Sequence, residues 1–129
     1  MSEANGLRVL VVEDEAMIAM LAEDMLDMAG CTLAGIASTL AEGLAAAERD
    51  DFDVAMLDMN LDGERSTPIA DRLRERGLPF IFTTGYGSSG IPDHHSDRPV
   101  CAKPYVLADL QATLFQAAGV NSSTSVNDS

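Results

Sequence analysis

Side chains suited to cation binding and phosphoryl chemistry follow directly after the short apolar runs of this sequence. Glu13 and Asp14 end one run, Asp58 ends a second and Lys103 ends a third. Carboxylates pressed together require a cation, and Mg²⁺ prefers their oxygens. With that cation bound, Asp58 could attack a phosphoryl group, while the ammonium of Lys103 and the hydroxyl of Thr84 stabilise its oxygens. The predicted product is an aspartyl phosphate.

Each of these residues also has an ordinary structural interpretation. Asp14 could cap the helix that follows it, with Glu13 a favourable charge at the same helix end. Asp58 taken alone is typical of a solvated loop. Lys103, however, is the single lysine of a chain whose basic residues total 8. Because four separate segments converge on one chemistry, the combination favours the functional interpretation.

Two kinds of apolar segment alternate along the chain and would position these residues. Short, nearly continuous apolar runs, typical of strands covered on both faces, predict strands at residues 7–12, 32–37, 54–57, 79–82 and 99–102. Helical spacing and end signals predict helices over residues 18–29, 40–49, 68–76 and 107–118.

This alternation predicts an α/β fold with a doubly wound, five-stranded parallel sheet and helices on both faces. The flavodoxin-like strand order 2-1-3-4-5 would place Asp14 and Asp58 side by side at the carboxyl edge. Residues 86–98 are rich in Gly, Ser, Asp and His and are predicted to hold at most a short helix.

Length and composition restrict the possible functions further. At 129 residues the chain has room for one domain, predicted at residues 7–118, and the polar residues 119–129 are predicted to form a disordered tail. The net charge of −13 argues against nucleic acid and anionic membranes as partners. We find no secretory signal and no apolar span of bilayer length, and Cys31 and Cys101 are expected to be buried thiols. A cytoplasmic protein is expected.

The motif set resembles the CheY-like receiver domain of two-component response regulators over residues 7–118. Glu13-Asp14, Asp58, Thr84 and Lys103-Pro104 stand in the order and at the spacings of that family. The segment from Asp58 to Gly63 is similar to the loop that follows the family's phosphoacceptor.

The resemblance implies a role for each residue. Asp58 would be the phosphoacceptor, and Mg²⁺ would be bound by Asp14, Asp58 and the backbone carbonyl of Asn60, with Glu13 acting through water. Thr84 and Lys103 would hold the phosphoryl oxygens. Such a protein catalyses only its own phosphorylation and dephosphorylation, so it is not expected to be an enzyme in the usual sense.

The switch expected of the family departs from its usual form. The position three residues before Lys103, where the family carries an aromatic side chain, is Val100. Residues 82–86 (FTTGY) with Lys103-Pro104-Tyr105 resemble the FAT GUY subgroup of alphaproteobacterial single-domain receivers, with Thr83 in place of alanine. We predict that residues 85–92 move, and that Tyr86 or Tyr105 supplies the aromatic contact alongside Thr84.

The subgroup resemblance implies partners. The phosphodonor would be a histidine kinase of the HWE or HisKA-2 type. No output domain follows in this sequence, so signalling is expected to run through contacts with a phosphotransfer protein or a downstream regulator.

Two other functions compete with this interpretation. One is a receiver that binds partners independently of phosphorylation. The other is a haloacid-dehalogenase-like phosphatase with an aspartate nucleophile, which is opposed by Asn60 where a second acid is expected and by the lack of an acidic pair after Lys103.

Two further motifs are interpreted as loops. Residues 85–90 match G-x-G-x-x-G by letter but do not follow a first strand, as a dinucleotide site requires. His94 and His95 could bind a transition metal, yet adjacent histidines lack the spacing of a structural site. We therefore expect both to lie on a solvated loop.

Overall fold

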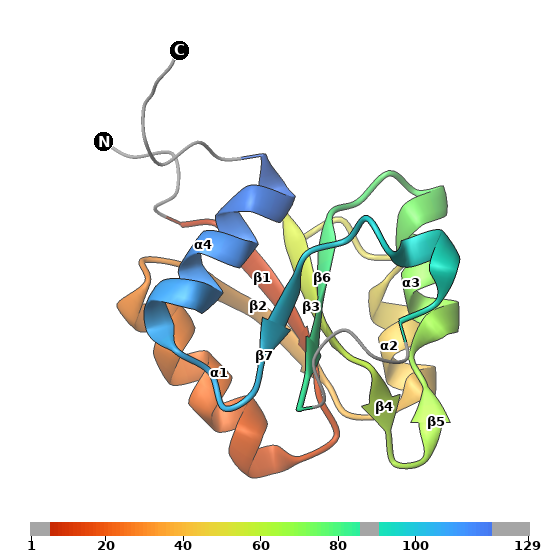
Figure 1. Ribbon diagram of the computed structural model, residues 1–129, viewed down its shortest axis with the longest axis horizontal. Helices are drawn as coiled ribbons and strands as arrows, with labels where there is room; N and C mark the ends of the chain where they lie inside the picture. The colour runs from red at the N-terminus through yellow and green to blue at the C-terminus, as the bar shows by residue number, and fades with distance from the viewer. Residues whose placement is uncertain (1–5, 86–90, 120–129) are drawn as a thin grey trace.

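The computed structural model describes residues 6–85 and 91–119, and its main sheet has five strands in the order β2-β1-β3-β6-β7 (Figure 1). Every neighbouring pair in this sheet is parallel. The strands are β1 (Arg8–Val12), β2 (Thr32–Ala37), β3 (Val54–Asp58), β6 (Phe80–Thr84) and β7 (Val100–Ala102). Since β6 and β7 are the fourth and fifth strands of this sheet, the predicted flavodoxin-like order is confirmed.

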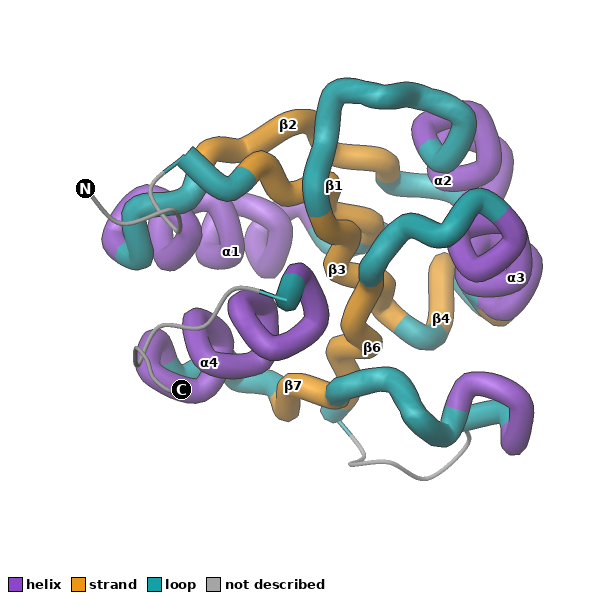
Figure 2. The backbone as a smooth tube through the Cα atoms, turned by 90° about the horizontal axis from the view of Figure 1, so that it is seen from above, coloured by secondary structure: helices purple, strands orange, loops and turns teal. Residues whose placement is uncertain are grey.

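Helices cover both faces of the sheet, as Figure 2 shows from above. The helices are α1 (Ala16–Met28), α2 (Leu40–Ala46), α3 (Thr67–Glu75) and α4 (Leu107–Ala118). Val9 and Val11 pack into the core beneath α1 and α4, whereas Leu10 and Val12 pack beneath α2 and α3. The period-two alternation of a strand therefore divides one continuous apolar run between two cores.

The predicted capping box begins α2. Thr39 Oγ1 accepts a hydrogen bond from Glu42 N at 3.1 Å, and Glu42 Oε1 accepts one from Ser38 N at 2.8 Å. This helix ends at Ala46, earlier than the predicted end near Arg49. The backbone N–H groups of Glu48 and Arg49 donate to the carbonyls three residues before them, which is the hydrogen-bond pattern of a 3₁₀ turn.

A glycine allows α2 and α3 to approach each other closely. A Cβ on Gly43 would lie 2.3 Å from Cδ1 of Ile69, a distance that real Cβ atoms essentially never show. Both residues are buried, so this contact sets the spacing of the two helices over the sheet.

A small hairpin follows β3 that the sequence did not predict. It pairs β4 (Asn60–Leu61) with β5 (Glu64–Arg65) in antiparallel fashion. Its central residues Asp62 and Gly63 have φ of 52° and 88°, the left-handed pair that a two-residue hairpin turn of this kind requires. The hairpin holds this segment at the carboxyl edge of the sheet.

The connection between β6 and β7 contains one turn of 3₁₀-helix, η1 (Asp93–His95), which agrees with the prediction of at most a short helix. Tyr86 and most of the predicted tail, residues 120–129, lie outside the described residues. No helix within the described ranges combines the length and the apolar character needed to cross a bilayer.

Candidate functional site

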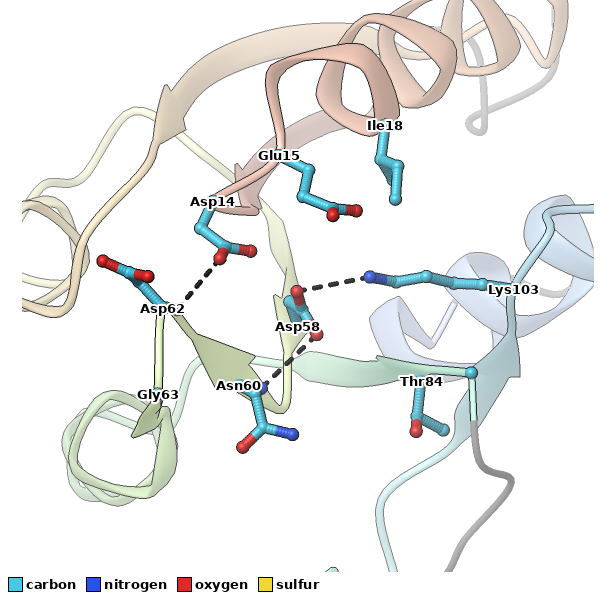
Figure 3. A pocket seen from close by; sticks show the side chains of 10 residues that line it. Asp14, Glu15, Ile18, Asp58, Asn60, Asp62, Gly63, Thr84 and Lys103 are labelled. Atoms are coloured by element: carbon cyan, nitrogen blue, oxygen red, sulfur yellow. Dashed lines mark hydrogen bonds and ion pairs between the residues drawn. The ribbon is translucent and has the colours of Figure 1, made fainter.

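A cleft of about 420 Å³ opens where the carboxyl ends of β1, β3, β6 and β7 meet (Figure 3). Parallel strands bring their carboxyl ends to one edge, so residues far apart in sequence line the same space. The lining residues are Asp14, Glu15, Ile18, Asp58, Asn60, Asp62, Gly63, Thr84, Gly85 and Lys103. Asp14, Asp58, Thr84 and Lys103 are thus brought together as the sequence predicted.

Lys103 binds two acids at once. Its Nζ lies 2.8 Å from Oε1 of Glu13 and 3.2 Å from Oδ2 of Asp58. Burial acts to lower the pKa of Lys103, but the hydrogen bond to Glu13 and the charge of Asp58 outweigh burial and raise that pKa above its ordinary value. The side chain therefore remains an ammonium at neutral pH.

Asp58 is held in a state that favours its proton. Burial, reinforced by the neighbouring Glu13, raises the pKa of Asp58 to about 7, although the ammonium of Lys103 opposes the rise. Oδ1 of Asp58 also accepts a long hydrogen bond of 3.4 Å from the backbone N–H of Asn60. The ammonium of Lys103 therefore compensates only part of the cost of burying the ionised carboxylate.

Three acids converge at the same place. Carboxylate oxygens of Glu13, Asp14 and Asp58 all lie within 4.8 Å of one another, which is the spacing of ligands around one cation. Asp14 does not cap α1, whose first flanking residue is Glu15. Instead, Oδ2 of Asp14 accepts a hydrogen bond of 2.9 Å from the backbone N–H of Asp62, at the turn of the β4–β5 hairpin.

The two adjacent threonines at the end of β6 have different surroundings. Thr84 lines the cleft, whereas Thr83 hydrogen-bonds with the buried Tyr105. Burial raises the pKa of Tyr105 to about 12, with the Thr83 hydrogen bond acting against the rise. Of the two predicted switch tyrosines, Tyr105 thus packs in the core beneath α1 and α4, and Tyr86 lies outside the described residues.

Sequence reasoning missed several residues of the cleft. Glu15 and Ile18 come from the start of α1, and Asp62 with Gly63 comes from the hairpin turn. The Asp-Gly pair is a typical hairpin signal and could have indicated the turn. Nothing in the sequence indicated that its backbone N–H would hold Asp14.

The interpretation of both histidines as solvated is wrong for His95, whose side chain is fully buried. Its ring packs edge-on against Phe80 and Phe82, with centroid distances of 5.5 and 6.0 Å. His94 remains exposed. Two aromatic neighbours and a carboxylate from α3 give the buried imidazole both its packing and its polar partner.

Comparison with known families identifies the family to which this fold belongs. The model of the response regulator receiver domain matches residues 9–95. The chain belongs to this family. Receivers of this family serve two-component signalling, interacting with histidine kinases and downstream regulators.

Individual relatives agree with this assignment. SdrG from Sphingomonas melonis Fr1 is 40% identical, and the match covers 93% of this chain and 100% of SdrG with a TM-score of 0.78. A second SdrG structure is described as the BeF3-activated conformation. NarL of Escherichia coli, a nitrate/nitrite response regulator, is 32% identical over 86% of this chain. The receiver domain of sensor histidine kinase PA1611 from Pseudomonas aeruginosa shows the shared fold, with a TM-score of 0.75. It is 24% identical, and the match covers 88% of this chain and 98% of that domain. That structure has a magnesium ion coordinated in its active site cleft.

The curated relatives are longer than this chain. It spans 52% of the length of NarL and 18% of the yeast transcription factor SKN7. The match therefore concerns the receiver portion of these proteins.

Proposed function

We propose that this receiver accepts a phosphoryl group on Asp58 from a histidine kinase, with Mg²⁺ bound beside it, and signals through contacts with other proteins. The observation that carries the proposal is the joint position of Lys103 and the three acids. One ammonium lies within 3.2 Å of Asp58, and the oxygens of Glu13, Asp14 and Asp58 lie within 4.8 Å of one another. Phosphoryl transfer needs this combination of nucleophile and opposite charges.

On the side of this chain, the transfer step uses residues that line or adjoin the cleft. A carboxylate oxygen of Asp58 attacks phosphorus, the bond from phosphorus to the donor imidazole nitrogen breaks, and the imidazole takes up a proton. Lys103 is positioned to move from the carboxylates to the phosphoryl oxygens. Thr84, at the end of the neighbouring strand β6, would donate its hydroxyl to another of these oxygens.

The donor set of the cleft fits Mg²⁺. Asp14 and Asp58 would bind the ion directly, the backbone carbonyl of Asn60 would complete the protein ligands, and Glu13 would act through water. The ion supplies charge that offsets the attacking and transferring oxygens. The raised pKa of Asp58 supports this assignment, because a buried carboxylate that favours its proton gains most from an added cation.

Exposed apolar side chains beside the cleft support a protein partner. α1 exposes Met17 to 82% and Met20 to 62%, and Leu21 also lines a neighbouring hollow of about 250 Å³ with Tyr105. Flexible methionines suit docking surfaces. We propose that the donor kinase docks here, that it is of the HWE or HisKA-2 type as the FAT GUY resemblance implies, and that the reaction takes place in the cytoplasm.

The signal would leave through the β6–β7 side of the sheet. We propose that Thr84 moves toward the phosphoryl group and that Tyr86 or Tyr105 provides the aromatic contact in place of Val100. A phosphotransfer protein or a downstream regulator would read the change.

Beryllofluoride with Mg²⁺ tests the proposal without a kinase. We expect amide NMR signals from the cleft, including residues 58–63, Thr84 and Lys103, to shift on addition in the wild type and to stay unchanged in Asp58→Asn. Absence of shifts in the wild type, or equal shifts in both proteins, would overturn the assignment of Asp58.

A further inference from the structure

The two histidines of the chain meet one carboxylate on the far side of β6 from α1. Nε2 of His94 lies 2.8 Å from Oδ1 of Asp71, and Nε2 of His95 lies 2.7 Å from the same oxygen. Asp71 belongs to α3 and the histidines to η1, so the cluster joins two elements that are more than twenty residues apart in sequence. None of its members lines the cleft that contains Asp58.

We propose that Asp71, His94 and His95 bind a first-row transition-metal dication such as Zn²⁺. Two imidazole nitrogens and one carboxylate oxygen are a ligand set that Zn²⁺ accepts, with water in the fourth position. This set differs from the oxygen-only cleft, so the two places would select different ions.

The geometry requires little adjustment. One atom from each of the three side chains already lies within 4.8 Å of the others. Ligand atoms around tetrahedral Zn²⁺ are about 3.3 Å apart, so the nitrogens would move outward from Asp71 by roughly half an ångström. His95 is held between Phe80 and Phe82, while the side chains of His94 and Asp71 are 58% and 49% exposed and give an ion access from solvent.

Arg74 determines which ring nitrogen of His95 carries the proton, and Zn²⁺ binding must change that position. Its Nε donates to Nδ1 of His95 at 3.4 Å, so Nε2 carries the proton and donates to Asp71. Coordination through Nε2 requires the proton on Nδ1, so binding changes the tautomer of His95 without net release of a proton from its ring. Arg74 would then turn away from His95 while keeping its ion pair with Asp97.

A bound ion would tie η1 to α3. Because η1 lies in the connection that starts directly after Thr84, the ion would restrain the part of the chain that follows the proposed switch residue. The metal site is independent of the phosphorylation of Asp58 and can be tested where that chemistry is disabled.

The test uses the full chain carrying Asp14→Asn and Asp58→Asn. These substitutions remove two of the three clustered carboxylates that could compete for Zn²⁺ in the cleft. Zn²⁺ is titrated by calorimetry, and ¹⁵N signals of the imidazoles are followed, since the chain has only two such rings. We expect one equivalent to bind, both Nε2 signals to change, and the proton of His95 to move to Nδ1.

Variants at exposed positions then identify the ligands. Asp71→Asn and His94→Gln should each lower the association constant by more than the roughly 10- to 100-fold typical of an outer-shell loss, and Arg74→Gln should raise it by removing the competing donor. Asp93→Asn, an exposed acid beside His94, is the matched control and should leave binding unchanged. No binding at millimolar Zn²⁺, or binding that Asp71→Asn and His94→Gln leave undiminished, would overturn the proposal.

Discussion

Replacing Asp58 by asparagine should stabilise the metal-free protein, and the gain should grow with pH. The pKa of Asp58 is about 7 in the folded protein and has an ordinary value of 3.8. Between these values the folded state holds a proton that the unfolded state has released, so wild-type stability falls as pH rises through this interval and levels off above pH about 7. Each pH unit is worth about 1.4 kcal/mol, which gives a total cost on the order of 4 kcal/mol at pH 8.

Asparagine keeps the shape of Asp58 and removes the cost of ionisation. Comparing pH 5 with pH 8, we expect the advantage of Asp58→Asn in free energy of unfolding to increase by about 3 kcal/mol, measured by urea denaturation with a chelator present. Asp62→Asn removes one exposed charge from the same cleft and serves as the control. Saturating Mg²⁺ should shrink the difference by stabilising the wild type. An advantage that is equal at both pH values would refute the argument that Asp58 is buried without sufficient opposing charge.

Substitutions can test three further contacts that define the site and its support. Lys103→Gln leaves the buried Glu13 carboxylate without its cation and should cost roughly 3 kcal/mol or more in metal-free denaturation; an unchanged midpoint would show that the pair is not buried as described. Gly43→Ala should cost about 1–3 kcal/mol by overpacking, and Ile69→Val, which removes the clashing Cδ1, should recover most of that cost in a double-mutant cycle; simple additivity would contradict the contact. Thr39→Ala should cost about 1 kcal/mol through loss of the α2 cap, and a thermal midpoint equal to that of the wild type would argue against the cap.

The sheet and the main cleft residues could be predicted because their signals are local. A strand buried on both faces, such as β3, requires a continuous apolar run, and the parallel order then brings Asp14, Asp58 and Lys103 to one edge whatever the loops do. The capping box at Thr39 could be predicted for the same reason, since its two partners are only three residues apart in sequence.

Contacts between distant segments could not be predicted in this way. The β4–β5 hairpin has two residues in each strand, too few to show a period, and the bond from Asp62 N–H to Asp14 joins positions 48 residues apart. His95 is buried because Asp71 and two phenylalanines surround it, and none of these neighbours is adjacent in sequence. Polarity alone therefore suggested a solvated loop.

The most direct test of the central claim is intact-mass spectrometry after incubation with Mg²⁺ and acetyl phosphate. The wild type and Asp62→Asn should each gain one phosphoryl adduct that is stable to acid and labile to base, because both retain the proposed acceptor, whereas Asp58→Asn should gain none. An adduct of equal yield on Asp58→Asn, or no adduct and no released phosphate from the wild type, would contradict phosphorylation of Asp58.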